Sequence, residues 1–178
     1  MKKKIAIFGS TGSIGKSLIE IIKHDKNNFE IILLTTNKNF SKLLNQAKIY
    51  KVKNLIITDK KSYEIVKKKK FKINIYNNFD NLNKIFKNKI DYVMSAISGI
   101  DGLSPTFQSI KYTKKIAIAN KESIICAWSI LKKELKKNNT KFIPVDSEHF
   151  SIWSALSTNK IINNIDEIFI TASGGPFY

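Results

Sequence analysis

The sequence is poor in several residue types that would point to particular classes of protein. It has one cysteine, Cys126, which excludes an internal disulfide and leaves no cysteine cluster to bind structural zinc. Its 3 prolines and 7 glycines form no flexible linker. No apolar run is long enough for a signal-peptide core or a membrane span. We therefore expect a cytoplasmic protein without a membrane partner.

Arginine is absent as well, and this affects how the charge is interpreted. The formal net charge is +17, but all 31 basic residues are lysine and they are spread along the whole chain. Nucleic-acid recognition usually relies on the bidentate guanidinium group and on a clustered basic patch. We interpret the charge as a solvated surface and expect no nucleic-acid partner, although a non-enzymatic basic binding module is kept as an alternative.

Short apolar runs rich in β-branched residues alternate with segments of helical periodicity, and 43% of the residues are hydrophobic. This alternation predicts an α/β fold, a Rossmann-like parallel sheet with helices on both faces. The expected strands are 5–9, 29–35, 54–58, 91–97, 115–119 and 141–145.

The first predicted strand runs into a glycine-rich turn, GSTGSIG at 9–15, which is followed by a predicted helix. Glycines three residues apart allow a tight turn and a close approach of the backbone to a pyrophosphate. The amides at the start of the helix can then meet the negative charge. In this position the turn predicts dinucleotide binding, although the alternative of a purely structural turn exists.

The end of the second predicted strand indicates which dinucleotide binds. An NAD site usually has an acidic residue there for the ribose 2′-hydroxyl. This chain instead has an amide, a cation and a second amide, namely Asn37, Lys38 and Asn39. A cation suits the 2′-phosphate of NADPH, so NADPH is the expected cofactor.

One motif favours a different class of enzyme. Tyr63 and Lys67 have the Tyr-x-x-x-Lys spacing of the short-chain dehydrogenases. They lie in a lysine-rich segment directly after the third predicted strand, before the sheet that would carry such a site is complete. We interpret the match as coincidental and keep this class as an alternative.

Five segments, in this order and spacing, resemble the 1-deoxy-D-xylulose 5-phosphate reductoisomerases, NADPH-dependent enzymes of non-mevalonate isoprenoid biosynthesis. They are GSTGSIG at 9–15, AISGIDGL at 96–103, ANKES at 119–123, PVDSEH at 144–149 and TASGGPF at 171–177. The resemblance covers the family's cofactor domain, here 1–145, and only the beginning of its α+β catalytic domain, here 146–178. It implies that this chain has less than half of the family enzyme, and that it binds NADPH without turning over substrate.

The resemblance also implies roles for individual residues. The cofactor would be bound by Thr11, Gly12, Ser13, Ile14, Asn37, Lys38, Asn39, Asn120 and Glu122. Lys121 would contact the substrate and take part in catalysis, and Ser173 would bind the substrate. The full-length enzyme would be a homodimer acting on a sugar phosphate.

Two carboxylates, Asp146 and Glu148, stand out in the otherwise basic chain. In an extended segment alternate side chains point the same way, so both could meet one Mg²⁺ or Mn²⁺ ion. The alternative is that Asp146 caps a helix beginning near Ser147, with Glu148 in its first turn. The resemblance implies that both are metal ligands and that Ser147 and Glu148 also contact the substrate, Glu148 being catalytic. We expect His149 to pack on a helix face and His24 to lie on the surface.

Overall fold

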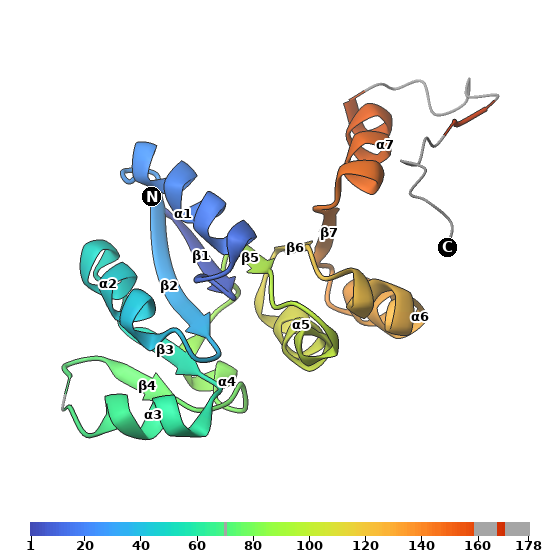
Figure 1. Cartoon of the computed structure of the whole chain (residues 1–178). Helices are drawn as coiled ribbons and strands as arrows, with labels where there is room; N and C mark the ends of the chain where they lie inside the picture. Colours follow the sequence, from blue (N-terminus) through green and yellow to red (C-terminus); the bar gives the residue numbers. More distant parts are fainter. Residues whose placement is uncertain (70, 159–166, 170–178) are drawn as a thin grey trace, which may run out of the picture.

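The computed structural model describes residues 1–69, 71–158 and 167–169. These residues form a parallel sheet of 7 strands in the order β4-β3-β2-β1-β5-β6-β7 (Figure 1). The strands are β1 (Lys3–Phe8), β2 (Phe29–Thr36), β3 (Asn54–Ile57), β4 (Asn74–Tyr76), β5 (Tyr92–Ser95), β6 (Lys115–Ile118) and β7 (Lys141–Pro144). The predicted Rossmann-like sheet is confirmed.

Helices follow nearly every strand, as parallel connections require. They are α1 (Ser13–His24), α2 (Phe40–Tyr50), α3 (Lys60–Lys67), α4 (Leu82–Ile85), α5 (Leu103–Ser109), α6 (Lys121–Lys137) and α7 (Ser147–Thr158), with short 3₁₀ turns at Ile100–Gly102 and Ile110–Tyr112. Among the described residues no helix is both long and apolar enough to cross a membrane.

Both faces of the sheet are covered, as expected from the near-continuous apolar strands. Along β1, Ile5 and Ile7 belong to a core cluster with residues of α1, α2 and α3. Ala6 and Phe8 point to the other face and join a cluster with residues of α4 and α6. Figure 1 shows α1 and α2 on one side of the sheet and α5 and α6 on the other.

One strand, β4, is missing from the expected set. It has only 3 residues, Asn74–Tyr76, and pairs with β3 alone at the edge of the sheet. A strand this short is too brief to show a recognisable apolar alternation, and the lysine-rich sequence before it resembles a turn. The number of strands was therefore underestimated by one.

The order in which successive strands are added to the sheet reverses beside β1, between β1 and β5. Strands β1 to β4 run outward in one direction, and β5 then returns to pair with the other edge of β1. Such a reversal leaves a crevice beyond the carboxyl ends of the two strands, where open α/β sheets bind their ligands.

Candidate functional site

A cleft of about 770 Å³ lies at this reversal, beyond the carboxyl ends of β1, β2, β3 and β5. Gly9 and Gly12 of the glycine-rich turn form one wall, and the segment after β5 forms the facing wall. The predicted cofactor residues that line it are Thr11, Gly12 and Asn37. The glycine-rich turn and the segment after β2 therefore lie where this fold binds ligands.

The glycine-rich turn needs glycine at two of its three glycine positions. Gly9 has a φ of +75°, and a Cβ there would lie 2.5 Å from the Ala96 carbonyl oxygen. A Cβ on Gly15 would lie 2.4 Å from the Gly9 carbonyl oxygen. At Gly12 the nearest atom would be 3.4 Å away, which is ordinary contact. The backbone conformation of the turn therefore requires glycine at positions 9 and 15. At position 12 a Cβ would fit, and its absence leaves open space beside the turn.

Helix α1 begins at this turn with its amide end open to an anion. Its N-cap, Gly12, supplies no side-chain hydrogen bond, and its first turn has no acidic residue. Ser13 and Ile14 are exposed in that first turn. The positive end of the helix dipole and its first amides thus face the region of the cleft.

The predicted residues after β2 differ in what their side chains do. The Asn37 amide donates to the Thr58 hydroxyl at 2.9 Å, and the Thr11 and Thr36 hydroxyls are 2.6 Å apart. The Asn39 oxygen accepts from the Lys42 amide at 3.3 Å and caps α2. The Lys38 side chain is exposed beside these groups and carries the positive charge of this segment.

Asn120 is buried and joins the loops that follow β5 and β6. Its side-chain nitrogen donates to the carbonyl oxygens of Ile97 at 2.5 Å and Gly99 at 2.6 Å, and its oxygen accepts from the Ser123 amide. It therefore caps α6 and fixes the wall of the cleft at the same time. The neighbouring Lys121 and Glu122 are exposed in the first turn of α6.

The segment with the two carboxylates is helical where an extended chain was expected. Helix α7 begins at Ser147, and the Asp146 carboxylate accepts a hydrogen bond from the His149 amide at 2.8 Å. The capping alternative is thus the observed local structure, and the argument from alternating side chains was wrong. A side chain at the N-cap and one in the first turn still lie near each other, because the chain turns between them.

The charges of Lys121 and Asp146 both act on the pKa of Glu148. Hydrogen bonds from its own backbone amide and from the Ser147 hydroxyl, followed by the nearby Lys121 charge, hold the pKa of Glu148 below its usual range. The Asp146 charge acts in the opposite direction on the same pKa. Residues from the starts of α6 and α7 are therefore brought together.

His149 does not pack on a helix face, so that expectation was wrong. Its side chain is 72% exposed, and its Nδ1 lies 2.7 Å from the Asp146 carboxylate oxygen, which is itself largely buried. Burial raises the pKa of Asp146, but the hydrogen bonds from the His149 amide and ring outweigh it and leave the pKa lowered. This contact could have been predicted from the sequence, because His149 lies three residues after an aspartate that can cap a helix.

The remaining predicted residues lie outside the cleft or outside the described part of the chain. Ser173 belongs to the undescribed residues. Within 1–69, 71–158 and 167–169, no three His, Cys, Asp or Glu side chains form a group that could hold a metal ion. Tyr63 and Lys67 lie on α3, with the ammonium group over the ring, and neither lines the cleft. The structure thus gives no support to the short-chain dehydrogenase alternative.

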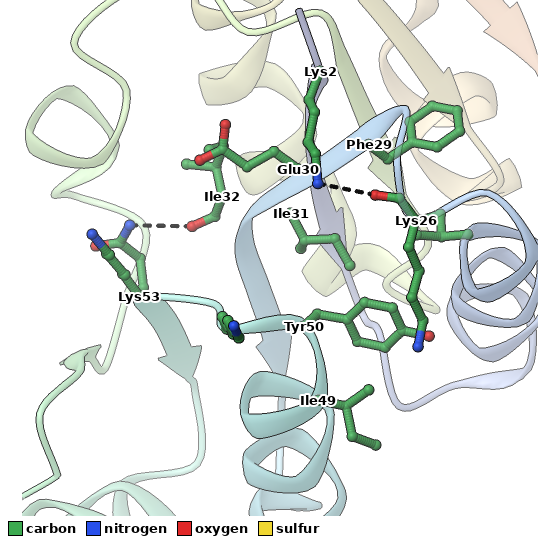
Figure 2. A pocket seen from close by; sticks show the side chains of 12 residues that line it. Lys2, Lys26, Phe29, Glu30, Ile31, Ile32, Ile49, Tyr50 and Lys53 are labelled. Atoms are coloured by element: carbon green, nitrogen blue, oxygen red, sulfur yellow. Dashed lines mark hydrogen bonds between the residues drawn. The ribbon is translucent and has the colours of Figure 1, made fainter.

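A second hollow, of about 490 Å³, lies at the opposite edge of the sheet, where β1, β2 and β3 begin (Figure 2). Lys2 and Tyr50 are among its lining residues, and Lys2 donates to the Lys26 carbonyl oxygen at 3.3 Å. None of the five sequence motifs contributes to it. It also lies at the amino edge of the sheet, which is the wrong edge for ligand binding in this fold.

Sequence reasoning missed several residues of the cleft. Asn77 and Asp80 line it from the segment between β4 and α4, and Gln108 lines it from α5. Such residues carry no motif of their own, and only the fold brings them to the carboxyl edge.

Two family models match the chain. The model described as 1-deoxy-D-xylulose 5-phosphate reductoisomerase matches residues 5–128, and that of the C-terminal domain of the same enzyme matches residues 142–178. The relative from Pelagibacter ubique with that name is 64% identical over 98% of this chain and 46% of its own length. A relative from Clostridium perfringens is 37% identical over 98% of this chain and 47% of its own length.

Solved structures agree. The Zymomonas mobilis reductoisomerase in complex with NADPH superposes with a TM-score of 0.76 at 31% identity, covering 84% of this chain and 40% of that one. A reductoisomerase in complex with NADPH, fosmidomycin and magnesium gives a TM-score of 0.77 at 32% identity, over 86% of this chain and 39% of that one. This chain spans about half the length of the curated relatives that it matches. It belongs to the 1-deoxy-D-xylulose 5-phosphate reductoisomerase family.

Proposed function

We propose that this chain supplies the NADPH-binding domain and part of the metal and substrate site of a 1-deoxy-D-xylulose 5-phosphate reductoisomerase. The complete enzyme would convert this sugar phosphate into 2-C-methyl-D-erythritol 4-phosphate. Family membership supports the reaction, and two similar solved structures are described as complexes with NADPH, one of them also with magnesium. The observation that carries the proposal is the cleft at the sheet reversal, with the glycine-rich turn in its wall.

For the cofactor, the proposal assigns the pyrophosphate to the turn and to the first amides of α1, from Thr11 to Ile14. The Lys38 cation, flanked by Asn37 and Asn39, would meet the 2′-phosphate. Asn120 and Glu122 would lie on the nicotinamide side, where Asn120 is hydrogen-bonded to the cleft wall after β5. This order follows the usual run of a dinucleotide across the carboxyl edge of such a sheet.

For the metal, Asp146 and Glu148 have the right chemistry but form only part of a shell. Hard carboxylate oxygens suit Mg²⁺ or Mn²⁺, and such ions take about six oxygen ligands. Two carboxylates held near each other and near Lys121 fit the partial site. When bound, the ion would act as a Lewis acid and template for the ketone and the adjacent hydroxyl of the substrate.

The chain's own residues would then orient the substrate. Lys121 would place its point charge beside a substrate oxygen, and Ser147 and Glu148 would bind the substrate from the start of α7. Ser173 would add a further contact. Loss of a hydroxyl proton starts the rearrangement, in which one carbon–carbon bond breaks and another forms. The resulting aldehyde would be reduced by hydride from the bound NADPH, and its oxygen would take up a proton.

Three further expectations belong to the proposal. They are the division into a cofactor domain, 1–145, and the beginning of a catalytic domain, 146–178, the cytoplasmic location and the homodimer of the complete enzyme. The two family models, which match 5–128 and 142–178, support the division.

Cofactor titration tests the proposal directly. We expect saturable binding of NADPH to the chain, followed by fluorescence, with an affinity about 10-fold higher than for NADH because the 2′-phosphate gains a charged partner. Lys38→Met should lower the NADPH affinity and leave the NADH affinity unchanged. Lys48→Met, in the last turn of α2, is the matched control that removes the same charge away from the cleft. Absence of saturable NADPH binding, with steeply salt-dependent binding to DNA instead, would favour a basic binding module.

A further inference from the structure

Gln46 lies in the middle of α2, yet its side chain reaches the glycine-rich turn instead of the solvent. It is only 6% exposed. Its Oε1 accepts a hydrogen bond from the Ser10 hydroxyl at 2.8 Å, and its Nε2 donates to the Ser10 carbonyl oxygen at 3.0 Å. One side chain of α2 therefore holds one residue of the turn at two points.

Strand β2 holds the same turn from its other side. The Ser10 amide donates to the Thr35 carbonyl oxygen at 2.9 Å, and the Gly9 amide donates to the Thr35 hydroxyl at 2.9 Å. Ser10 and Thr35 are almost completely buried. The amide side of Ser10 is thus fixed by the sheet, and its carbonyl side is fixed by Gln46.

The orientation of this carbonyl determines the direction of the next amide. The Ser10–Thr11 peptide bond is trans, so its C=O and N–H groups point in opposite directions. The C=O points to Gln46 in the interior. The Thr11 N–H therefore points away from the interior, and Thr11 is one of the residues that line the cleft.

We propose that Gln46 is a positioning residue for the dinucleotide: it holds the Ser10–Thr11 peptide so that the Thr11 amide faces the pyrophosphate. This inference rests on the proposed NADPH function and extends it to a residue of α2 that does not line the cleft. The pyrophosphate is common to NADPH and NADH, so Gln46 sets the affinity for both. Lys38 acts only on the 2′-phosphate.

The first test is Gln46→Leu, which keeps an apolar body of similar size and loses both hydrogen bonds. We expect NADPH and NADH to bind about 10-fold more weakly, since one charge-assisted hydrogen bond to phosphate is misdirected. Thr140→Val is the matched control. Thr140 is also buried, and its hydroxyl donates to the carbonyl oxygens of Ile110 at 2.8 Å and Thr113 at 2.9 Å, away from the cleft. It should lower the unfolding free energy and leave both cofactor affinities unchanged.

Two further variants separate positioning from packing. Ser10→Ala removes the hydroxyl that bonds to Gln46 but keeps the bond from Gln46 to the carbonyl oxygen, so we expect a smaller loss of affinity than in Gln46→Leu. Gln46→Met keeps the unbranched shape and the length of the side chain but has neither the amide donor nor the oxygen acceptor, so it should lose as much affinity as Gln46→Leu. Equal losses in Ser10→Ala and Gln46→Leu, or cofactor affinity kept in folded Gln46→Met, would overturn the proposal.

Amide NMR of the unliganded chain tests the same inference without the cofactor. In Gln46→Met the Thr11 amide resonance should shift or broaden, and in Thr140→Val it should stay in place. A Thr11 resonance unchanged in Gln46→Met would refute the positioning role even if the parent chain binds NADPH. Conversely, a parent chain that binds no NADPH, with the expected shift of Thr11, would reject the proposed function and retain the structural role of Gln46.

Discussion

The glycine-rich turn and the carboxylate segment are both parts of the candidate site, but they are held in different ways. Ser10, Thr35 and Gln46 are buried and linked by hydrogen bonds that join β1, β2 and α2. Glu148 and His149 are exposed, and the described hydrogen bonds of residues 146–151 stay within that segment. The turn is built by the whole fold, whereas the carboxylates are arranged mainly by one turn of helix.

This difference indicates which function the chain can perform alone. A buried network that spans three elements fixes its geometry before a ligand arrives, which lowers the cost of binding. The start of α7, where Glu148 and His149 are exposed, lacks such a network and has a lower local stability. We therefore expect the cofactor half of the site to be preformed here and the metal half to be adjustable. Four measurements test this difference between the two regions.

The largest expected effect is on catalysis. The chain should bind NADPH yet show no turnover of 1-deoxy-D-xylulose 5-phosphate with Mg²⁺ or Mn²⁺, because its described residues supply only two carboxylates for the ion. Oxidation of NADPH, followed by absorbance, is the measurement. Sustained oxidation that depends on substrate and metal would show that the two regions already form a complete site.

A large effect is also expected at the glycine-rich turn. Gly15→Ala places a Cβ against the backbone of Gly9 and Ser10, which cannot move without disturbing the buried network. We expect a loss of about 3 kcal/mol in the free energy of unfolding and of most NADPH affinity. Gly12→Ala is the control, since its Cβ has room and its φ of −75° suits alanine. Equal stability of the two variants in urea unfolding would mean that the turn is not held rigidly.

A smaller effect is expected from the carboxylates. Asp146→Asn and Glu148→Gln should each weaken Mn²⁺ binding by about 10-fold, because one of two charged ligands is neutralised. The NADPH affinity should change by less than about two-fold, since neither carboxylate is among the residues proposed to bind the cofactor. Mn²⁺ binding by electron paramagnetic resonance and NADPH binding by fluorescence report the two properties separately. A parallel loss of NADPH affinity would contradict the independence of the two regions.

The smallest expected effect is on the stability of the fold at low pH. The Lys114 ammonium group and the Lys4 amide hold the pKa of Asp91 below its usual range, at the amino edge of the sheet. This contact stabilises the fold above the ordinary carboxyl pKa of about 4 and is lost as the pH falls through the lowered pKa.

We therefore expect Asp91→Asn to cost less than about 1 kcal/mol at neutral pH, with the difference from the parent chain shrinking in acid. Urea unfolding at several pH values measures this. Asp146→Asn should leave the global unfolding almost unchanged. If instead Asp146→Asn, and not Asp91→Asn, removed the acid sensitivity of unfolding, α7 would unfold together with the sheet.

The parts of the site that were predictable are those with local signals. The apolar runs predicted six strands, and the glycine spacing predicted the turn and the helix after it, because both depend on residues close in sequence. β4 was missed because three residues carry no detectable period. The course of residues 146–148 was misjudged because one short stretch can be read either as a strand or as a capped helix start.

The amino-acid sequence was enough to predict the alternation of strands and helices, the glycine-rich turn, the cation after β2 and the residue types of the candidate metal site. These follow from short-range periodicity and from the chemistry of single side chains. The packing of the fold was needed to show that Gln46 contacts Ser10 across 36 residues, that Asn120 joins two loops, and that the charge of Lys121 acts on Glu148. The reason is physical: a polar side chain is buried only where a partner from another element satisfies it, and such partners are brought together by the packing of the sheet.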